Sequence, residues 1–183
     1  MKRKFHARFL GGRGRVNRLR LPGPVMQEAA WPYNLPIWRR YHRAASPDGK
    51  LVACIDPAWE VSMGNPTSGT LCVSRGPHIP RCNPSFVWSD DSLFLTVPQY
   101  FSRFGLVTRQ RLLVIAFDKR QVYASKMSAW YFQPETFVGG TLAVSVNPFR
   151  SKQMAEFKIP SDLGRSFTRL HVPWPEMAQH EGG

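Results

Sequence analysis

Apolar residues occur along this chain in short runs that are separated by Pro, Gly, Asn, Asp and Ser. Short apolar or alternating runs bounded by such residues are typical of β-strands, whereas a helix would need a longer run with a repeat near 3.6 residues. The expected strands are 51–55, 59–63, 70–74, 85–88, 93–98, 111–117, 121–125, 128–132, 136–138, 141–146 and 154–159. The pattern therefore predicts a mainly β fold.

Two of these segments also indicate their place in a sheet. Residues 112–117 are apolar at every position, as in a strand that is buried on both faces, so this strand should be central. Residues 154–159 alternate, with Ala155, Phe157 and Ile159 on one face, which indicates a half-buried strand at an edge.

A turn followed by a strand occurs twice, at an offset of 43 residues. Segment 45–53 reads ASPDGKLVA and segment 88–96 reads WSDDSLFLT, which aligns Ser46 with Ser89. Pro presets its own φ in such turns, and Asp hydrogen-bonds to the backbone two residues further on. A third, weaker copy follows at a similar step, where residues 132–137 precede a Gly-Gly turn and the run 141–146. A period in the low forties is typical of propeller blades.

These turn motifs resemble those of WD40-like and TolB-like β-propellers, and the resemblance covers residues 41–160. It implies a platform that binds peptides or other proteins. The chain has room for about three blades, whereas propellers close with at least about four. We therefore expect antiparallel blade-like repeats of about 43 residues that form a partial propeller or a twisted β-sandwich. The corresponding function is a non-enzymatic protein-binding module, such as a scaffold or a toxin-neutralising protein.

Composition agrees with this organisation. The 16 Pro, 14 Gly and 13% aromatic residues favour short strands and tight turns over helices. A chain of 183 residues suits one core. We expect a basic disordered tail over 1–27, a single β-rich domain over 28–165 and a C-terminal tail over 166–183. The aromatic, Pro-rich stretch 28–44 should lie extended and cover a sheet edge with Trp31, Ile37 and Trp38.

The net charge of +13 is concentrated near the N-terminus. Eight of the 25 basic residues precede the first acidic residue, Glu28, which leaves 17 basic and 12 acidic residues and a charge of +5 for the rest. The alternative function is therefore nucleic-acid binding, with Arg13, Arg15, Arg18 and Arg20 as an electrostatic tether. The same segment is also compatible with a solvated tail, a targeting segment or a start site assigned too far upstream.

Cys54, Cys72 and Cys82 are odd in number and lack the close pairing of a zinc site. Because Cys54 and Cys72 lie in apolar strand-like runs, we expect reduced, buried thiols and a reducing, cytoplasmic location. The chain has no apolar run long enough to span a membrane and no apolar segment typical of a secretory signal.

Motifs for catalysis are missing from the sequence. It contains no Gly-x-Ser-x-Gly and no phosphate-binding Gly loop. His78 and Cys82 could supply two metal ligands, but a site needs more, so we expect no metal, no cofactor and no catalytic residue. Asp48 and Asp91 are expected to brace turns. A hydrolase or a hydrolase accessory domain is the second alternative, and it would depend on Asp90, Asp91 or Ser68.

The segment 99–110 is longer than a hairpin turn requires, and it combines aromatic with basic residues. Long aromatic loops on a rigid sheet often contact partners, although these rings could equally fold back onto the body. The predicted partner-binding residues are Tyr100, Phe101, Arg103, Phe104, Arg109 and Arg111. Such a loop would suit an acidic protein surface or a nucleic-acid phosphate.

Overall fold

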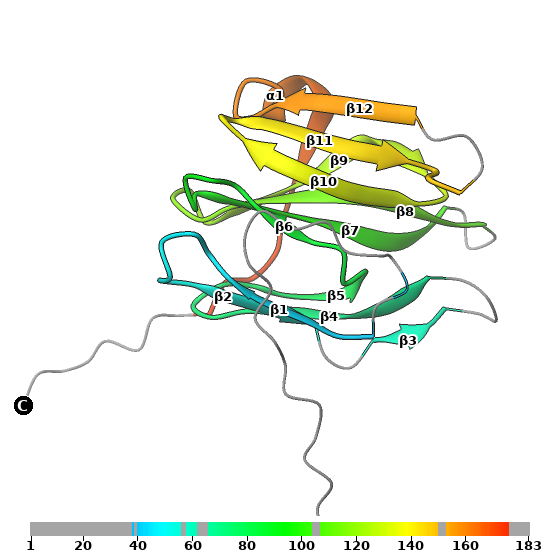
Figure 1. Ribbon diagram of the computed structural model, residues 1–183, viewed down its shortest axis with the longest axis horizontal. Coiled ribbons are helices and arrows are strands. Elements are labelled where there is room, and N and C mark those ends of the chain that lie inside the picture. Colours follow the sequence, from blue (N-terminus) through cyan, green and yellow to red (C-terminus); the bar gives the residue numbers. More distant parts are fainter. Residues whose placement is uncertain are drawn as a thin grey trace, which may run out of the picture.

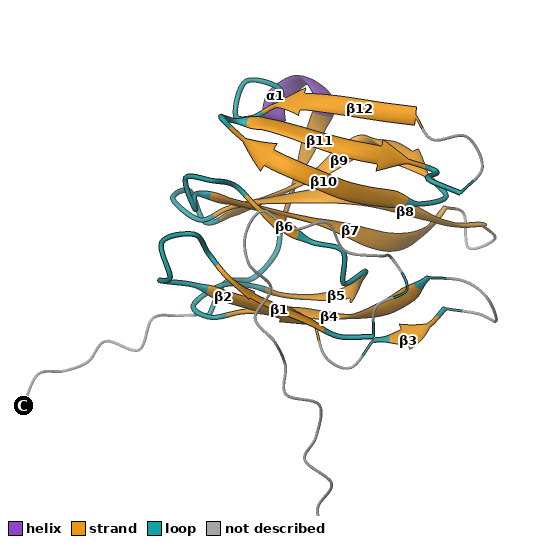
Figure 2. Cartoon of the chain, in the orientation of Figure 1, coloured by secondary structure: helices purple, strands orange, loops and turns teal. Residues whose placement is uncertain are grey.

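The computed structural model shows a mainly β chain with one short helix in the part that it describes (Figures 1 and 2). The described residues are 38, 40–55, 58–61, 66–103, 107–149 and 153–175, with only the backbone of Arg103 and Val107. The predicted basic tail and its four tether arginines lie outside this part of the chain, as do Trp31, Ile37 and Phe104.

The strands lie in three layers that follow one another along the chain (Figure 1). The first layer contains β1 (His42–Ala45), β2 (Val52–Ile55), β4 (Thr67–Val73) and β5 (His78–Cys82), with β3 (Trp59–Glu60) paired to β4. The second contains β6 (Val87–Trp88), β7 (Phe94–Arg103), β8 (Val107–Ala116), β9 (Gln121–Ala129) and β13 (Phe167–Leu170). The third contains β10 (Phe132–Val138), β11 (Thr141–Val146) and β12 (Gln153–Lys158), and α1 (Leu163–Ser166) precedes β13.

All strand pairs are antiparallel, and the first two layers belong to one hydrogen-bonded sheet. Among the described residues, their strands pair through Cys82 and Gln99, between β5 and β7. The described strands close into neither a barrel nor a propeller. The expectation of antiparallel β structure is therefore confirmed, while the propeller is not.

Strand β8 separates two hydrophobic cores. Its Leu113 and Ile115 side chains belong to the core between the first and second layers. Leu112 and Val114 belong to the core between the second and third layers. All four are 0% exposed, because β8 lies between β7 and β9 with a packed layer on each face. The predicted central, doubly buried strand is confirmed.

The two copies of the turn motif adopt the same hydrogen-bond network. The Ser46 hydroxyl donates to Asp48 Oδ1 at 2.6 Å and accepts from the backbone N–H of Leu51 at 3.0 Å. The Ser89 hydroxyl donates to Asp91 Oδ1 at 2.6 Å and accepts from the N–H of Phe94 at 2.9 Å. The predicted bracing of both turns by Asp is confirmed.

Turns of successive layers are also bonded to one another at one end of the molecule. The backbone N–H of Asp48 donates to Ser92 Oγ at 3.0 Å, which joins the first turn to the second. The N–H of Gly139, in the Gly-Gly turn between β10 and β11, donates to Asp90 Oδ2 at 2.8 Å. The 43-residue repeat therefore corresponds to three stacked hairpin turns.

Two segments within the predicted domain differ from their predicted structure. Most of the expected loop 99–110 continues β7 and β8, which pair from Phe94–Ala116 to Arg103–Val107. The Pro-rich stretch around His78 forms β5, whose register with β4 shifts at a bulge. Strands that contain polar side chains and prolines do not show the alternation of apolar and polar residues by which strands are predicted. Pairing with a neighbouring strand stabilises them instead.

The β-rich structure also extends past residue 165, into the segment predicted as a C-terminal tail. Strand β13 pairs with β9, and its Phe167 is buried in the second core. Val172 and Trp174 then pack against the first core.

Strand β12 forms the edge of its sheet, as predicted. No helix in the described residues has the length and apolar character needed to cross a membrane.

Candidate functional site

Exposed or partly exposed aromatic side chains and arginines gather where β7 and β9 end and β8 begins. We call this surface the aromatic–arginine end. It consists of Trp38, Phe101, Arg109, Arg111, Trp130, Tyr131 and Phe149. The stacked turns lie at the other ends of these strands (Figure 1). The layers therefore give the molecule two chemically different ends.

The β7–β8 pairing places the arginines. Arg111 lies opposite Gln99 and Arg109 lies opposite Phe101. The Arg111 guanidinium donates two hydrogen bonds to Gln99 Oε1, at 2.8 and 3.0 Å, and its Cζ lies 5.4 Å from the centre of the Phe101 ring. Burial lowers the pKa of Arg111 from its ordinary value. The hydrogen bonds and the ring contact hold this guanidinium in one orientation.

Arg109 makes the equivalent contact with the neighbouring strand. Its Cζ lies 4.4 Å from the centre of the Trp130 ring, at the end of β9. Such a cation–π contact contributes about 0.5–1 kcal/mol at an exposed site. Trp130 remains 42% exposed, so a large part of its ring is accessible beside a fixed positive charge.

A second group of rings continues this surface. Asn147 Oδ1 accepts hydrogen bonds from the backbone N–H groups of Trp130 and Tyr131, which fixes the chain between β9 and β10. The Phe149 ring lies 6.4 Å from Tyr131 and 4.3 Å from Trp38, measured between ring centres. Phe149 is 52% exposed and Trp38 is 42% exposed, although clusters of this kind are usually buried.

Some of the predicted partner-binding residues lie at the surface, and Tyr100 does not. It brings together Phe101, Arg109 and Arg111 at the surface. Tyr100 is buried, its hydroxyl donates to the carbonyl of Pro66 at 3.2 Å, and burial raises the pKa of the phenol. Tyr100 therefore belongs to the packing beneath this surface and is not part of the surface itself. Arg103 is described only by its backbone at the end of β7, and Phe104 lies outside the described residues.

Pattern reasoning did not identify Phe149 as part of this surface. Phe149 follows the Asn147-Pro148 turn after β11, and only the packing of the third layer against the second brings it to Tyr131. The one sequence feature that could have indicated an exposed Phe149 is its position immediately after a turn, because turns lie at the protein surface. Trp38, which we expect to cover a sheet edge, contacts Phe149.

The carboxylates named for the hydrolase alternative have structural partners. Asp91 Oδ1 accepts from Ser89 and from the N–H of Leu93, and Asp90 accepts from the N–H groups of Asp91 and Gly139. Among the described residues, no three or more His, Cys, Asp or Glu side chains are placed to hold a metal ion.

Comparisons with protein-family models, with curated proteins and with solved structures found no match for this chain.

Proposed function

We propose that this chain is a binding protein whose aromatic–arginine end holds another protein through a surface that is both acidic and apolar. The observation that carries the proposal is that two exposed ring contacts meet at consecutive residues: Arg109 lies over Trp130, and Phe149, which also contacts Trp38, lies beside Tyr131. Trp, Tyr and Arg are the residues that contribute most to protein interfaces. A partner that covered these rings would gain apolar burial, while its carboxylates would meet fixed guanidinium groups.

The rigidity of the surface supports this role. Gln99 fixes Arg111, and Asn147 fixes the backbone that carries Trp130 and Tyr131. Side chains that are already ordered lose little conformational entropy when a partner binds, so more of the contact energy appears as affinity.

The experiment is a pull-down from the lysate of the native cells with the full chain, after nuclease treatment and a high-salt wash. The test variant combines Trp130→Ala with Phe149→Ala. The matched control combines Leu93→Ala with Val138→Ala, because these side chains are similarly exposed (44% and 47%) but lie near the stacked turns. We expect a stoichiometric protein that the control retains and the test variant loses by about 30-fold or more, as for interface hot spots. Equal retention by both variants would contradict the proposal.

A nucleic-acid partner is a second candidate, and one observation favours it. Trp38, which follows the basic N-terminal segment in the sequence, lies against Phe149 in the aromatic–arginine end. Exposed rings beside arginines also form stacking platforms for unpaired bases. This candidate predicts that the full chain binds a single-stranded oligonucleotide with an affinity that falls steeply with salt. Replacing Arg13, Arg15, Arg18 and Arg20 by Gln should weaken that binding and leave a protein partner bound.

A further inference from the structure

A row of chemically active side chains crosses the outer face of the first layer. The strand register pairs Arg43 with Cys54, Cys54 with Cys72, and Cys72 with His78. Directly paired residues of neighbouring strands project to the same face of a sheet. Their sequence neighbours Ala53 and Leu71 are buried in the first core, so the row lies on the opposite face.

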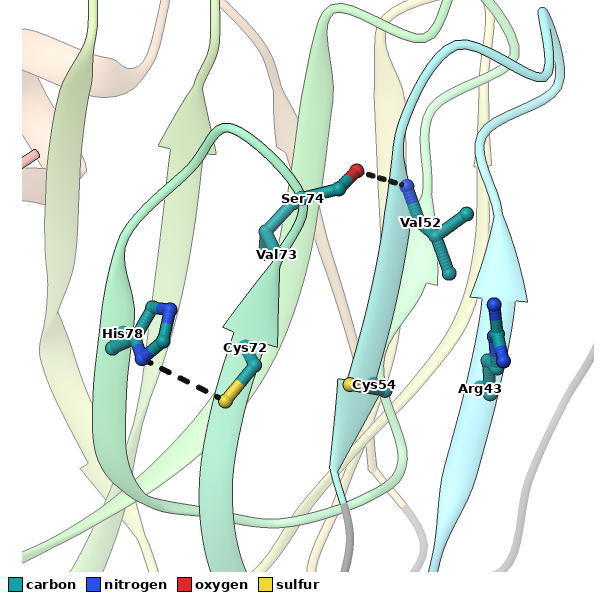
Figure 3. A pocket seen from close by; sticks show the side chains of 7 residues that line it. All are labelled: Arg43, Val52, Cys54, Cys72, Val73, Ser74 and His78. Carbon is teal, nitrogen blue, oxygen red and sulfur yellow. Dashed lines mark hydrogen bonds between the residues drawn. The ribbon is translucent and has the colours of Figure 1, made fainter. Parts of the chain in front are cut away.

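These residues line one pocket, which is shown in Figure 3. The pocket has a volume of about 520 Å³, and its lining is completed by Val52, Val73 and Ser74. Cys72 Sγ lies 3.9 Å from His78 Nδ1. Cys54 and Cys72 are thiols that are both partly exposed, which corrects the prediction that they are buried. His78 lies beside Cys72, whereas the sequence suggested a pairing with Cys82.

We propose that Cys54 and Cys72 form a peroxide-reactive thiol pair that closes into an intramolecular disulfide, with Cys72 as the attacking sulfur. The backbone already suits this bond. Directly paired residues of antiparallel strands have Cα atoms about 4.5–5.5 Å apart. Disulfides span Cα separations of about 4.4–6.8 Å.

The neighbours of Cys72 suit the attack. The nucleophile in thiol chemistry is the thiolate, so the attacking thiol needs a neighbouring group that can take its proton. The His78 imidazole is within reach of the Cys72 proton. Arg43, which is paired with Cys54, supplies a positive charge to the same pocket, and the pocket gives a small peroxide access to both sulfurs.

The reaction balances with hydrogen peroxide as the oxidant. His78 accepts the proton of Cys72, and the thiolate attacks one peroxide oxygen. The O–O bond breaks, so Cys72 becomes a sulfenic acid, and the leaving oxygen takes up the proton as water. The Cys54 sulfur then attacks the sulfenic sulfur, an S–S bond forms, and the hydroxyl group leaves as a second water with the Cys54 proton. The two thiols lose two electrons and the peroxide gains two.

Cys82 provides an internal control in the same layer. It is 0% exposed, and burial raises the pKa of its thiol. A buried thiol that resists ionisation is inert towards peroxide. The proposal therefore predicts that one thiol of the three remains unmodified.

The test treats the reduced full-length chain with one equivalent of hydrogen peroxide and then alkylates the remaining thiols. We expect a mass loss of about 2 Da from disulfide formation, a peptide that links Cys54 to Cys72, and alkylated Cys82. In Cys54→Ser, Cys72 should accumulate as a sulfenic acid that dimedone traps. In Cys72→Ser, the reaction of Cys54 should be slower than that of Cys72 in the unsubstituted chain.

A second variant tests the imidazole. His78→Ala should lower the rate with peroxide by about 100-fold, and added imidazole should restore it, because a positioned base is replaced from solution. His171→Ala removes another exposed His and should change nothing. The proposal is overturned if no Cys54–Cys72 peptide forms, if Cys82 is oxidised as fast as Cys72, or if His78→Ala reacts at the original rate.

Discussion

Replacing Ser89 with Ala tests whether the repeated turn stabilises the fold through its serine hydroxyl. Ser89 is 1% exposed, and its hydroxyl is the acceptor for the buried N–H of Phe94 at 2.9 Å. An unsatisfied buried donor costs about 1–3 kcal/mol. The bond to Asp91 is also lost, but that carboxylate is exposed and can be hydrated. We therefore expect a loss of about 2 kcal/mol in the free energy of unfolding.

The first copy of the turn is a built-in comparison. Ser46 makes the same hydrogen bonds, but its hydroxyl accepts from the backbone N–H of Leu51, a residue that is only partly buried. Water can replace part of that bond, so Ser46→Ala should cost about 1 kcal/mol or less. Ser161→Ala serves as the control, because the Ser161 hydroxyl donates to Lys158 in an exposed bond and surface changes usually stay within about 0.5 kcal/mol.

Equilibrium urea unfolding followed by tryptophan fluorescence measures all three variants. The midpoint of thermal unfolding should fall by about 2–4 °C for each kcal/mol in a chain of this size. Ser89→Ala that is as stable as the control, or a larger loss of stability in Ser46→Ala than in Ser89→Ala, would contradict this role of the serine hydroxyl. Either result would mean that packing, rather than the hydroxyl network, holds the turns.

Two further predictions concern turn chemistry. Gly140→Ala should lower the midpoint of thermal unfolding more than Gly139→Ala does. Both glycines have positive φ, but an added Cβ at Gly140 would lie 2.8 Å from the Ile159 carbonyl oxygen, whereas nothing lies within 4 Å of an added Cβ at Gly139. Equal losses in the two variants would contradict this prediction. The hydrogen bond from the Ser46 hydroxyl, followed by that from a backbone N–H, lowers the pKa of Asp48 to about 2. Because the unfolded pKa is about 3.9, the stabilisation is complete above that value and is lost as the pH falls towards 2. An NMR titration should show the low pKa and its rise in Ser46→Ala, and an Asp48 pKa near 4 in the unsubstituted chain would refute the assignment.

How much the sequence could predict depended on how far apart the interacting residues lie in the chain. The two Ser-Asp turns were predictable because Ser, Asp and the strand that follows interact within five residues. The doubly buried β8 was predictable because a strand with two packed faces needs apolar residues at every position.

The aromatic–arginine end could be predicted only in part. The sequence singled out Phe101, Arg109 and Arg111, but it assigned Phe101 and Arg109 to a loop and began the next strand only at Arg111, because polar residues hid the continuation of β7 and β8. Their fixed orientations come from pairing across the hairpin, and the neighbouring ring of Trp130 comes from β9. Contacts of this kind depend on register, which a single sequence does not specify where one face of a strand is polar.

The amino-acid sequence by itself determined the class of fold, the repeated turns and the central strand, since each follows from local backbone chemistry or from the period of burial. Tertiary structure alone decided that the repeats stack without closing, that β13 returns to β9, and that Cys54, Cys72 and His78 share one face. These contacts join residues that lie far apart in the chain, so no local pattern in the sequence indicates which of them will meet. They form only when burial of the two cores fixes which strands pair and in which register.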